Sequence, residues 1–191
     1  MRMVAVNTLS RSIVGVALAT GVLLLVPLTA MRFTDEVDWT ALDFSVAGGL
    51  LFGAGLSFVL LVRTAGSFAC RAAAGIAVAA ALMLVWVNLA VGIIGAGNNP
   101  ANLMYAGVVA IEVIGVLWAR LRPTGMSHAL SATAIAQAGV AVIALAGGLG
   151  ANEPPGPLGI LALNGFFVAL FAVSALLFRH AARSHGARKA A

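Results

Sequence analysis

Long apolar stretches alternate with short polar segments along this chain. The apolar stretches lie at residues 12–30, 44–62, 72–95, 103–119, 128–149 and 158–178. Each is close to the roughly 20 residues that a helix needs to cross the hydrocarbon core of a bilayer. The connecting segments hold the turn formers Gly, Pro and Asn and nearly all of the charges. The pattern predicts an all-α protein, a polytopic bundle of six transmembrane helices that forms a single membrane domain over residues 1–191.

The composition also indicates a chain embedded in lipid. Hydrophobic residues make up 62% of the sequence and charged residues only 9%, whereas soluble domains carry about 25% charged residues. The formal net charge of +5 would also suit a nucleic-acid partner, but the arginines stand at the ends of the apolar stretches rather than along one basic face. We therefore expect the lipid bilayer as the main partner and no nucleic acid.

Basic and acidic residues fall on opposite sides of the predicted spans. Ten of the eleven Lys and Arg residues lie on one side, namely Arg2, Arg11, Arg63, Arg71, Arg120, Arg122, Arg179, Arg183, Arg188 and Lys189. Five of the six acids lie on the other, namely Asp35, Glu36, Asp38, Asp43 and Glu153. Because Lys and Arg accumulate in short cytoplasmic loops, this predicts an N-in, C-in topology.

The sixth acid, Glu112, lies near the middle of the stretch 103–119. A charged carboxylate at this depth costs several kcal/mol or more, so it should face the bundle interior, a wet cavity or a partner, and burial favours its neutral form. One interpretation is a carboxylate that binds a proton or a cation. The other is a neutral side chain that is hydrogen-bonded to a neighbouring helix.

Three amide side chains also lie within the apolar stretches: Asn88, Gln137 and Asn164. Counting along the predicted spans places Gln137 level with Glu112, and Asn88 roughly level with Asn164. The four residues could therefore line one polar intramembrane site, in which the Gln137 amide satisfies the Glu112 carboxyl. The alternative is that each amide joins one pair of helices by a hydrogen bond worth about 1 kcal/mol or less.

Glycines in the second stretch suggest close helix packing. Gly49 and Gly53 have the GxxxG spacing that lets two membrane helices approach closely. The simplest interpretation is packing inside the monomer. The same face could instead join a second copy of the chain or a larger membrane complex.

Two aromatic residues stand near opposite ends of the stretch 103–119. These are Tyr105 and Trp118. Tyr and Trp are enriched where membrane meets water. We therefore expect both to be interface anchors.

The chemistry of an enzyme is missing from the spans. No histidine pair that could bind haem lies inside a predicted span, and no HExxH motif occurs. His128 stands at the edge of a stretch, and no His or Lys lies deeper within a span to activate a serine. The single cysteine, Cys70, has no neighbouring metal-ligating residues. The sequence therefore predicts no catalytic residue, no metal site and no cofactor, and we expect that the protein is not an enzyme.

Three stretches, 33–39, 86–95 and 98–105, are similar to segments of small uncharacterised six-span inner-membrane proteins of high-GC bacteria. The resemblance implies a compact multi-pass bundle in the bacterial inner membrane and no particular activity. From the polar residues within the spans, Glu112, Gln137, Asn88 and Asn164, we expect a small transporter or channel-like protein with a polar intramembrane site. The alternative is a non-catalytic accessory or assembly subunit of a larger membrane complex.

Overall fold

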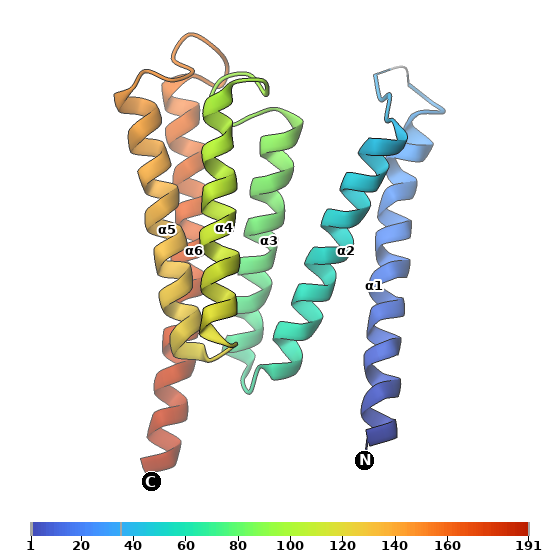
Figure 1. Ribbon diagram of the computed structural model, residues 1–191, viewed down its shortest axis with the longest axis vertical. Coiled ribbons are helices and arrows are strands. Elements are labelled where there is room, and N and C mark those ends of the chain that lie inside the picture. Colours follow the sequence, from blue (N-terminus) through green and yellow to red (C-terminus); the bar gives the residue numbers. More distant parts are fainter. Residues whose placement is uncertain (1, 35, 191) are drawn as a thin grey trace. The chain divides into compact units, whose positions relative to one another are not determined.

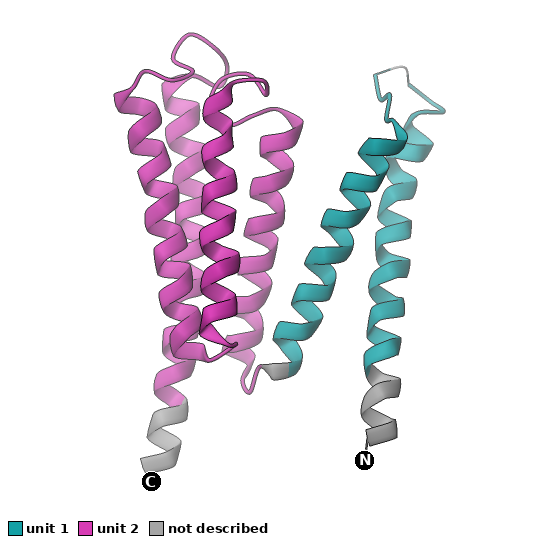
Figure 2. Ribbon diagram, viewed as in Figure 1, with its two compact units in different colours: residues 1–63 teal, residues 64–191 magenta. Residues whose placement is uncertain are grey.

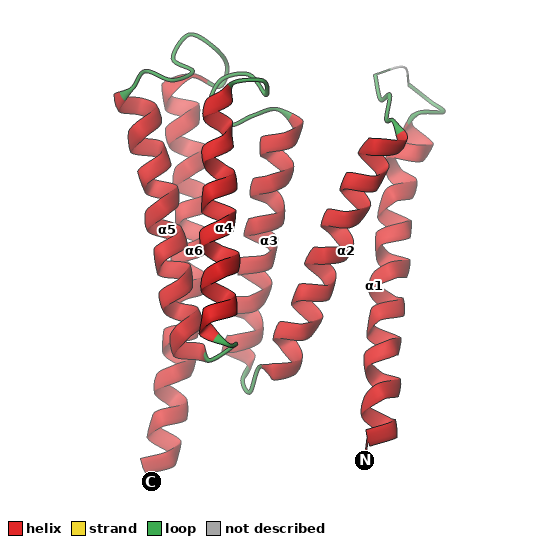
Figure 3. Ribbon diagram, in the orientation of Figure 1, coloured by secondary structure: helices red, strands yellow, loops and turns green. Residues whose placement is uncertain are grey.

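The computed structural model describes the backbone of residues 2–34 and 36–190, and the side chains of residues 9–34, 36–63 and 65–184. All regular structure in this part of the chain is helical (Figures 1 and 3). The helices are α1 (Arg2–Ala30), α2 (Ala41–Thr64), α3 (Phe68–Ala90), the 3-10 helix η1 (Pro100–Leu103), α4 (Met104–Ala119), α5 (Pro123–Ala146) and α6 (Gly156–Ala190). Six of them are long and apolar enough to cross a membrane. The predicted all-α fold with six spans is confirmed.

Several helix ends differ from the sequence prediction, and two of them have a clear local cause. α3 ends at Ala90 rather than at residue 95, because Gly92 and Gly95 adopt the left-handed φ values of 78° and 63°, which turn the chain out of the helix. α5 begins at Pro123, five residues before the apolar stretch. Proline suits the first helical position, because an N–H group there would have no acceptor within the helix and proline lacks that group.

The chain forms two compact units, Met1–Arg63 and Thr64–Ala191 (Figure 2). The first unit contains α1 and α2, and the second contains the other helices. Each unit has its own internal packing.

In the first unit, α1 and α2 form an antiparallel hairpin. The Arg63 guanidinium donates a 3.3 Å hydrogen bond to Ser12 Oγ at the open end of the hairpin. At the connected end, the backbone N–H and the hydroxyl of Thr40 both donate to Asp43 Oδ2 over 2.7 Å. This places a carboxylate at the N-terminus of α2, where the helix dipole favours negative charge.

Two glycines allow the close approach of these helices. A Cβ added to Gly55 would lie 2.6 Å from Val16 Cγ1, and one added to Gly48 would lie 3.3 Å from Leu24 Cδ1. Gly49 and Gly53 are exposed instead, and added Cβ atoms there would meet no atom within 4 Å. The close contact of the hairpin is therefore made by Gly48 and Gly55, and the GxxxG pair lies on another face of α2.

In the second unit, α5 packs against both α4 and α6, and α6 packs against α3, whereas α3 and α4 contact each other less. Added Cβ atoms at Gly115 and Gly125 would collide with Ala129 and Ala119, so α4 and α5 lie almost in backbone contact near the turn that joins them. Such closeness is the means by which helices associate in lipid, where hydrophobicity alone gives no attraction between them.

The two ends of this bundle differ in structure. The loops 91–99 and 147–155 lie together at one end, here called the loop end (Figure 1). The opposite end, here called the basic end, holds the α4–α5 turn and the last described part of α6. It carries Arg71, Arg120, Arg122, Arg179 and Arg183.

Asn102 organises the loop end. Its Oδ1 accepts hydrogen bonds from the backbone N–H groups of Ile93 and Ile94, at 3.0 and 2.9 Å, and its Nδ2 donates to the carbonyls of Ile94 and Ala96. One side chain therefore satisfies four backbone groups of a non-helical segment, as burial in a membrane requires. Ile93 and Ile94 are fully buried and close this end of the bundle.

Candidate functional site

Glu112 lies on the face of α4 that is turned toward the interior of the bundle. The buried residues of α4 are Tyr105, Val108, Glu112 and Ala119, which repeat at the three- and four-residue steps of one helix face. Glu112 is 6% exposed. Its Oε2 is buried and has no hydrogen-bond partner among the described residues. The carboxyl is therefore held inside the protein with an unmet hydrogen bond.

A hydrogen-bonded group of three side chains joins α4, α5 and α6 inside the same bundle. Asn164 Oδ1 accepts from Gln137 Nε2 at 2.9 Å and from the Tyr105 hydroxyl at 3.1 Å. Asn164 Nδ2 donates at 2.8 Å to the carbonyl of Ile160, one turn earlier on its own helix. The three side chains are at most 1% exposed. Both polar atoms of the Asn164 side chain thus have partners, and its oxygen fixes the direction of the Gln137 amide.

The fixed amide leaves Gln137 Oε1 buried without a partner in the described part of the chain. This acceptor and the Glu112 carboxyl belong to adjacent helices. The contacts Gly115–Ala129 and Gly125–Ala119 set the register, in which Gln137 lies about five residues, or roughly 7 Å, closer to the loop end than Glu112.

The lean of the two side chains reduces this offset. Side chains lean toward the N-terminus of their own helix. Because α4 and α5 are antiparallel, Glu112 leans toward the loop end and Gln137 toward the basic end, so they lean toward each other. A protonated Glu112 offers the one group, a hydroxyl donor, that Gln137 Oε1 lacks.

Asn88 belongs to a different part of the bundle. Its Nδ2 donates a 3.2 Å hydrogen bond to the carbonyl of Asn102, and its Oδ1 is buried without a described partner. Asn88 therefore supports the loop end. The structure brings Gln137 and Asn164 into direct contact and places Glu112 on the neighbouring helix face, but it links Asn88 to the residues that close the bundle.

Tyr105 is the site residue that the sequence analysis missed. Its expected role as an interface anchor is wrong, because the side chain is 1% exposed and its hydroxyl is bonded to Asn164. Trp118, in contrast, is 88% exposed. The signal was present in the sequence, since Tyr105, Val108 and Glu112 share one helix face.

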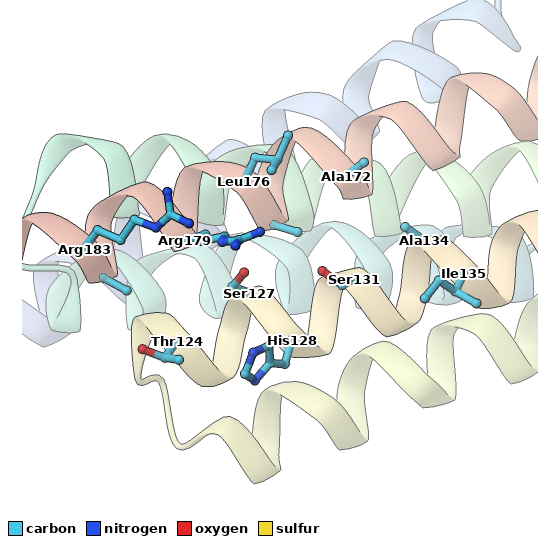
Figure 4. Close-up of a pocket in the computed structure, with 12 residues that line it drawn as sticks. Thr124, Ser127, His128, Ser131, Ala134, Ile135, Ala172, Leu176, Arg179 and Arg183 are labelled. Carbon is cyan, nitrogen blue, oxygen red and sulfur yellow. The ribbon is translucent and has the colours of Figure 1, made fainter.

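A cavity of about 790 Å³ opens between α5 and α6 toward the basic end (Figure 4). Its lining consists of Thr124, Ser127, His128, Ser131, Ala134, Ile135, Ala172, Ala175, Leu176, Arg179, Ala182 and Arg183. Ala134 lies one helical turn before Gln137 on the same side of α5. The cavity therefore extends to within about a turn of the polar cluster, while Ile93, Ile94 and Asn102 close the opposite end.

Two further buried polar side chains of this interior form structural hydrogen bonds. Among the described residues, no three of His, Cys, Asp and Glu lie close enough to hold a metal ion. Thr133 and Ser174 are buried, and their hydroxyls donate to the backbone carbonyls of Ala129 and Ala73. These hydroxyls are therefore committed to structural hydrogen bonds, and Glu112 supplies the buried carboxyl of this interior.

No protein-family model, curated protein or solved structure matches this chain. The functional argument therefore depends on the helices, the polar cluster and the cavity themselves. The likeness to inner-membrane proteins of high-GC bacteria stays a prediction.

Proposed function

We propose that this integral membrane protein is a small proton-coupled transporter of the bacterial inner membrane, in which Glu112 takes up and releases the proton. The observation that carries the proposal is that two buried atoms on adjacent helices, Glu112 Oε2 and Gln137 Oε1, have no hydrogen-bond partner among the described residues. The direction in which side chains point along antiparallel helices brings these two residues toward each other. Acidic residues inside a membrane bundle are rare because of their cost and commonly mark ion and proton pathways.

The two protonation states of Glu112 require different arrangements of the cluster. When protonated, Glu112 donates to Gln137 Oε1, and Gln137 Nε2 keeps its bond to Asn164. When the proton leaves, the carboxylate needs a donor, which Gln137 supplies by turning its amide group toward α4. Asn164 Oδ1 then keeps only the Tyr105 hydroxyl. The charge of one residue thereby changes the contacts among α4, α5 and α6, as coupling requires.

Access to the cluster differs between the two ends of the bundle. The cavity between α5 and α6 reaches Ala134 from the basic end, and the buried pair Ile93 and Ile94 closes the loop end. With the topology that the arginines favour, the open side faces the cytoplasm. This arrangement suits a cytoplasm-open state of a protein that exposes its site to one side at a time.

Proton movement in liposomes tests this proposal. The purified protein is reconstituted with a pH-sensitive dye inside the vesicles, and a potassium diffusion potential drives protons inward. We expect a protein-dependent acidification that Glu112→Gln reduces to the level of protein-free vesicles. Glu36→Gln, the same change at an exposed loop position, should leave it intact. A flux that Glu112→Gln does not alter, or no flux above that of empty vesicles, would overturn the proposal.

A role as an accessory subunit is the second candidate, and the first unit favours it. No part of the apolar window of α1 is buried, and the exposed pair Gly49 and Gly53 offers α2 a surface for close helix contact. A second copy of the chain or a larger complex would fit this face. Mass analysis after extraction in a lipid-retaining detergent tests this role: a stoichiometric partner that Gly49→Ile and Gly53→Ile release would support it, and a lone chain would contradict it.

A further inference from the structure

The cavity between α5 and α6 has one polar end and one apolar end (Figure 4). Toward the basic end it is lined by Thr124, Ser127, His128, Arg179 and Arg183. Deeper in the bundle its walls are Ala134, Ile135, Ala172, Ala175 and Leu176. We propose that this cavity binds an anionic phospholipid, with the phosphate at the arginines and an acyl chain along the apolar walls.

The positive charges at the polar end of the cavity favour binding of an anion. Arg179 and Arg183 both line the cavity, no carboxylate lines it, and neither arginine pairs with an acid among the described side chains. Guanidinium groups bind phosphate oxygens through two parallel hydrogen bonds. Basic pockets between transmembrane helices on the cytoplasmic side are known to suit phospholipid head groups.

Ser127 provides a second and independent indication of a ligand. Its side chain is 6% exposed and lines the cavity, yet its hydroxyl has no hydrogen-bond partner among the described residues. Figure 4 shows this hydroxyl pointing toward the side of the cavity on which Arg179 lies. Its oxygen is not one of the fully buried atoms without a partner, so the hydroxyl is accessible from the cavity, and a phosphate oxygen held by Arg179 would accept its hydrogen bond.

The first turn of α5 adds donors at the same place. The helix begins at Pro123, and no side chain caps it. The free N–H groups and the positive end of the helix dipole at this position favour an anion. Thr124, the next residue, is part of the cavity wall.

The length of the cavity distinguishes a lipid from a free anion. Along α6 it extends from Arg183 to Ala172, which is roughly 16 Å of helix and therefore about half of the 30 Å hydrocarbon core. A free phosphate would occupy only the polar end. A phospholipid of one leaflet would fill both ends, with its head group among the arginines and its chain beside Ile135 and Leu176.

Lipid binding to the full chain in detergent tests the proposal by native mass spectrometry. Phosphatidylglycerol and phosphatidylcholine with the same acyl chains are compared, and inorganic phosphate is added as a competitor. We expect the anionic lipid to bind at least about tenfold more tightly than the zwitterionic one. Millimolar phosphate should not displace it.

Three variants locate the site. Arg179→Gln should weaken phosphatidylglycerol about tenfold, whereas Arg71→Gln, at an exposed arginine outside the cavity, should not. Ala172→Leu narrows the apolar part without changing any charge, so it should weaken the lipid and keep the protein monodisperse.

Three results would overturn the proposal. Equal binding of the two lipids would remove the preference for an anion. If Arg179→Gln and Arg71→Gln weakened phosphatidylglycerol binding equally, the lipid would be attracted to the basic end in general and not to this cavity. Displacement of the lipid by phosphate would identify a site for a free anion. None of these measurements depends on proton transport, so the two proposals can fail separately.

Discussion

The side-chain nitrogen of Gln137 lies 2.9 Å from Asn164 Oδ1, and this bond turns the other end of the Gln137 amide away from α6. The oxygen at that end is buried without a described partner. Asn164 also receives the Tyr105 hydroxyl at 3.1 Å. One asparagine on α6 therefore determines which group of Gln137 is available to Glu112 on α4.

This relationship predicts that the bonds to Asn164 are energetically coupled. Tyr105→Phe keeps the aromatic ring and removes one hydrogen bond, so the free energy of unfolding should fall by about 0.6 kcal/mol and by no more than about 1.7 kcal/mol, the average and the maximum for bonds between membrane helices. In an Asn164→Leu background the same change should cost almost nothing, because the acceptor is already gone. A double-mutant cycle of unfolding in detergent measures the loss of unfolding free energy in both backgrounds. Equal losses would show that the hydrogen bond between Tyr105 and Asn164 contributes nothing.

Asn102 should be far more sensitive to substitution than a neighbouring asparagine. Asn102→Ala leaves buried backbone groups of Ile93 and Ile94 without partners, at a cost of about 1 to 3 kcal/mol for each lost partner. Asn98→Ala, at an exposed position of the same loop, should have little effect. Thermal unfolding of the two variants in the same detergent tests this difference, and similar melting temperatures would contradict it.

The hairpin of the first unit offers a test by rescue. Gly55→Ala places a Cβ 2.6 Å from Val16 Cγ1, and a β-branched side chain has little freedom to move away, so the hairpin should be destabilised. Val16→Ala removes the obstructing methyl groups and should restore it. Ser12 and Arg63 are hydrogen-bonded in the structure. Cross-linking between cysteines placed at these two positions therefore measures how much of the protein keeps α1 and α2 packed as a hairpin. Gly53→Ala, with open space around it, is the neutral control.

The orientation of the chain can be read by labelling. Cys70 is 2% exposed, so Cys70→Ala gives a background for single new cysteines with a small change in volume. With both termini in the cytoplasm, a membrane-impermeant maleimide should modify Asp38→Cys on intact cells. Ser184→Cys should react only after the membrane is opened. The reverse order of labelling would refute the N-in, C-in topology.

The spans could be predicted from the sequence because each depends on a local property. An apolar run of sufficient length must be a helix in lipid, and all six predicted stretches overlap a helix of the structure. The ends were less predictable, since residues 91–95 are as apolar as the span before them. Gly92 and Gly95 end the helix through left-handed backbone angles, which hydropathy does not reveal.

The candidate site could be predicted only in part. Polarity alone identified Glu112, Gln137 and Asn164 as residues that need partners inside the bundle. Which partner each one takes depends on the register between helices, and that register is fixed by the contact of Gly115 with Ala129. The same limit explains why Tyr105 was assigned to the interface: its place near a helix end favoured an anchor, whereas the neighbouring helices bury it.

The arrangement around Asn102 also affects how the molecule can be manipulated. Loops of membrane proteins are the usual places for epitope tags, fused reporters and antibody sites, and the segment 91–103 would be chosen first from its Gly, Asn and Pro content. Its backbone is held by the side chains of Asn102 and Asn88 and by the carboxylate of Glu153, which accepts from the N–H of Ala96 at 2.9 Å. An insertion there would separate these groups, so the segment around Glu36 is the better site for a tag.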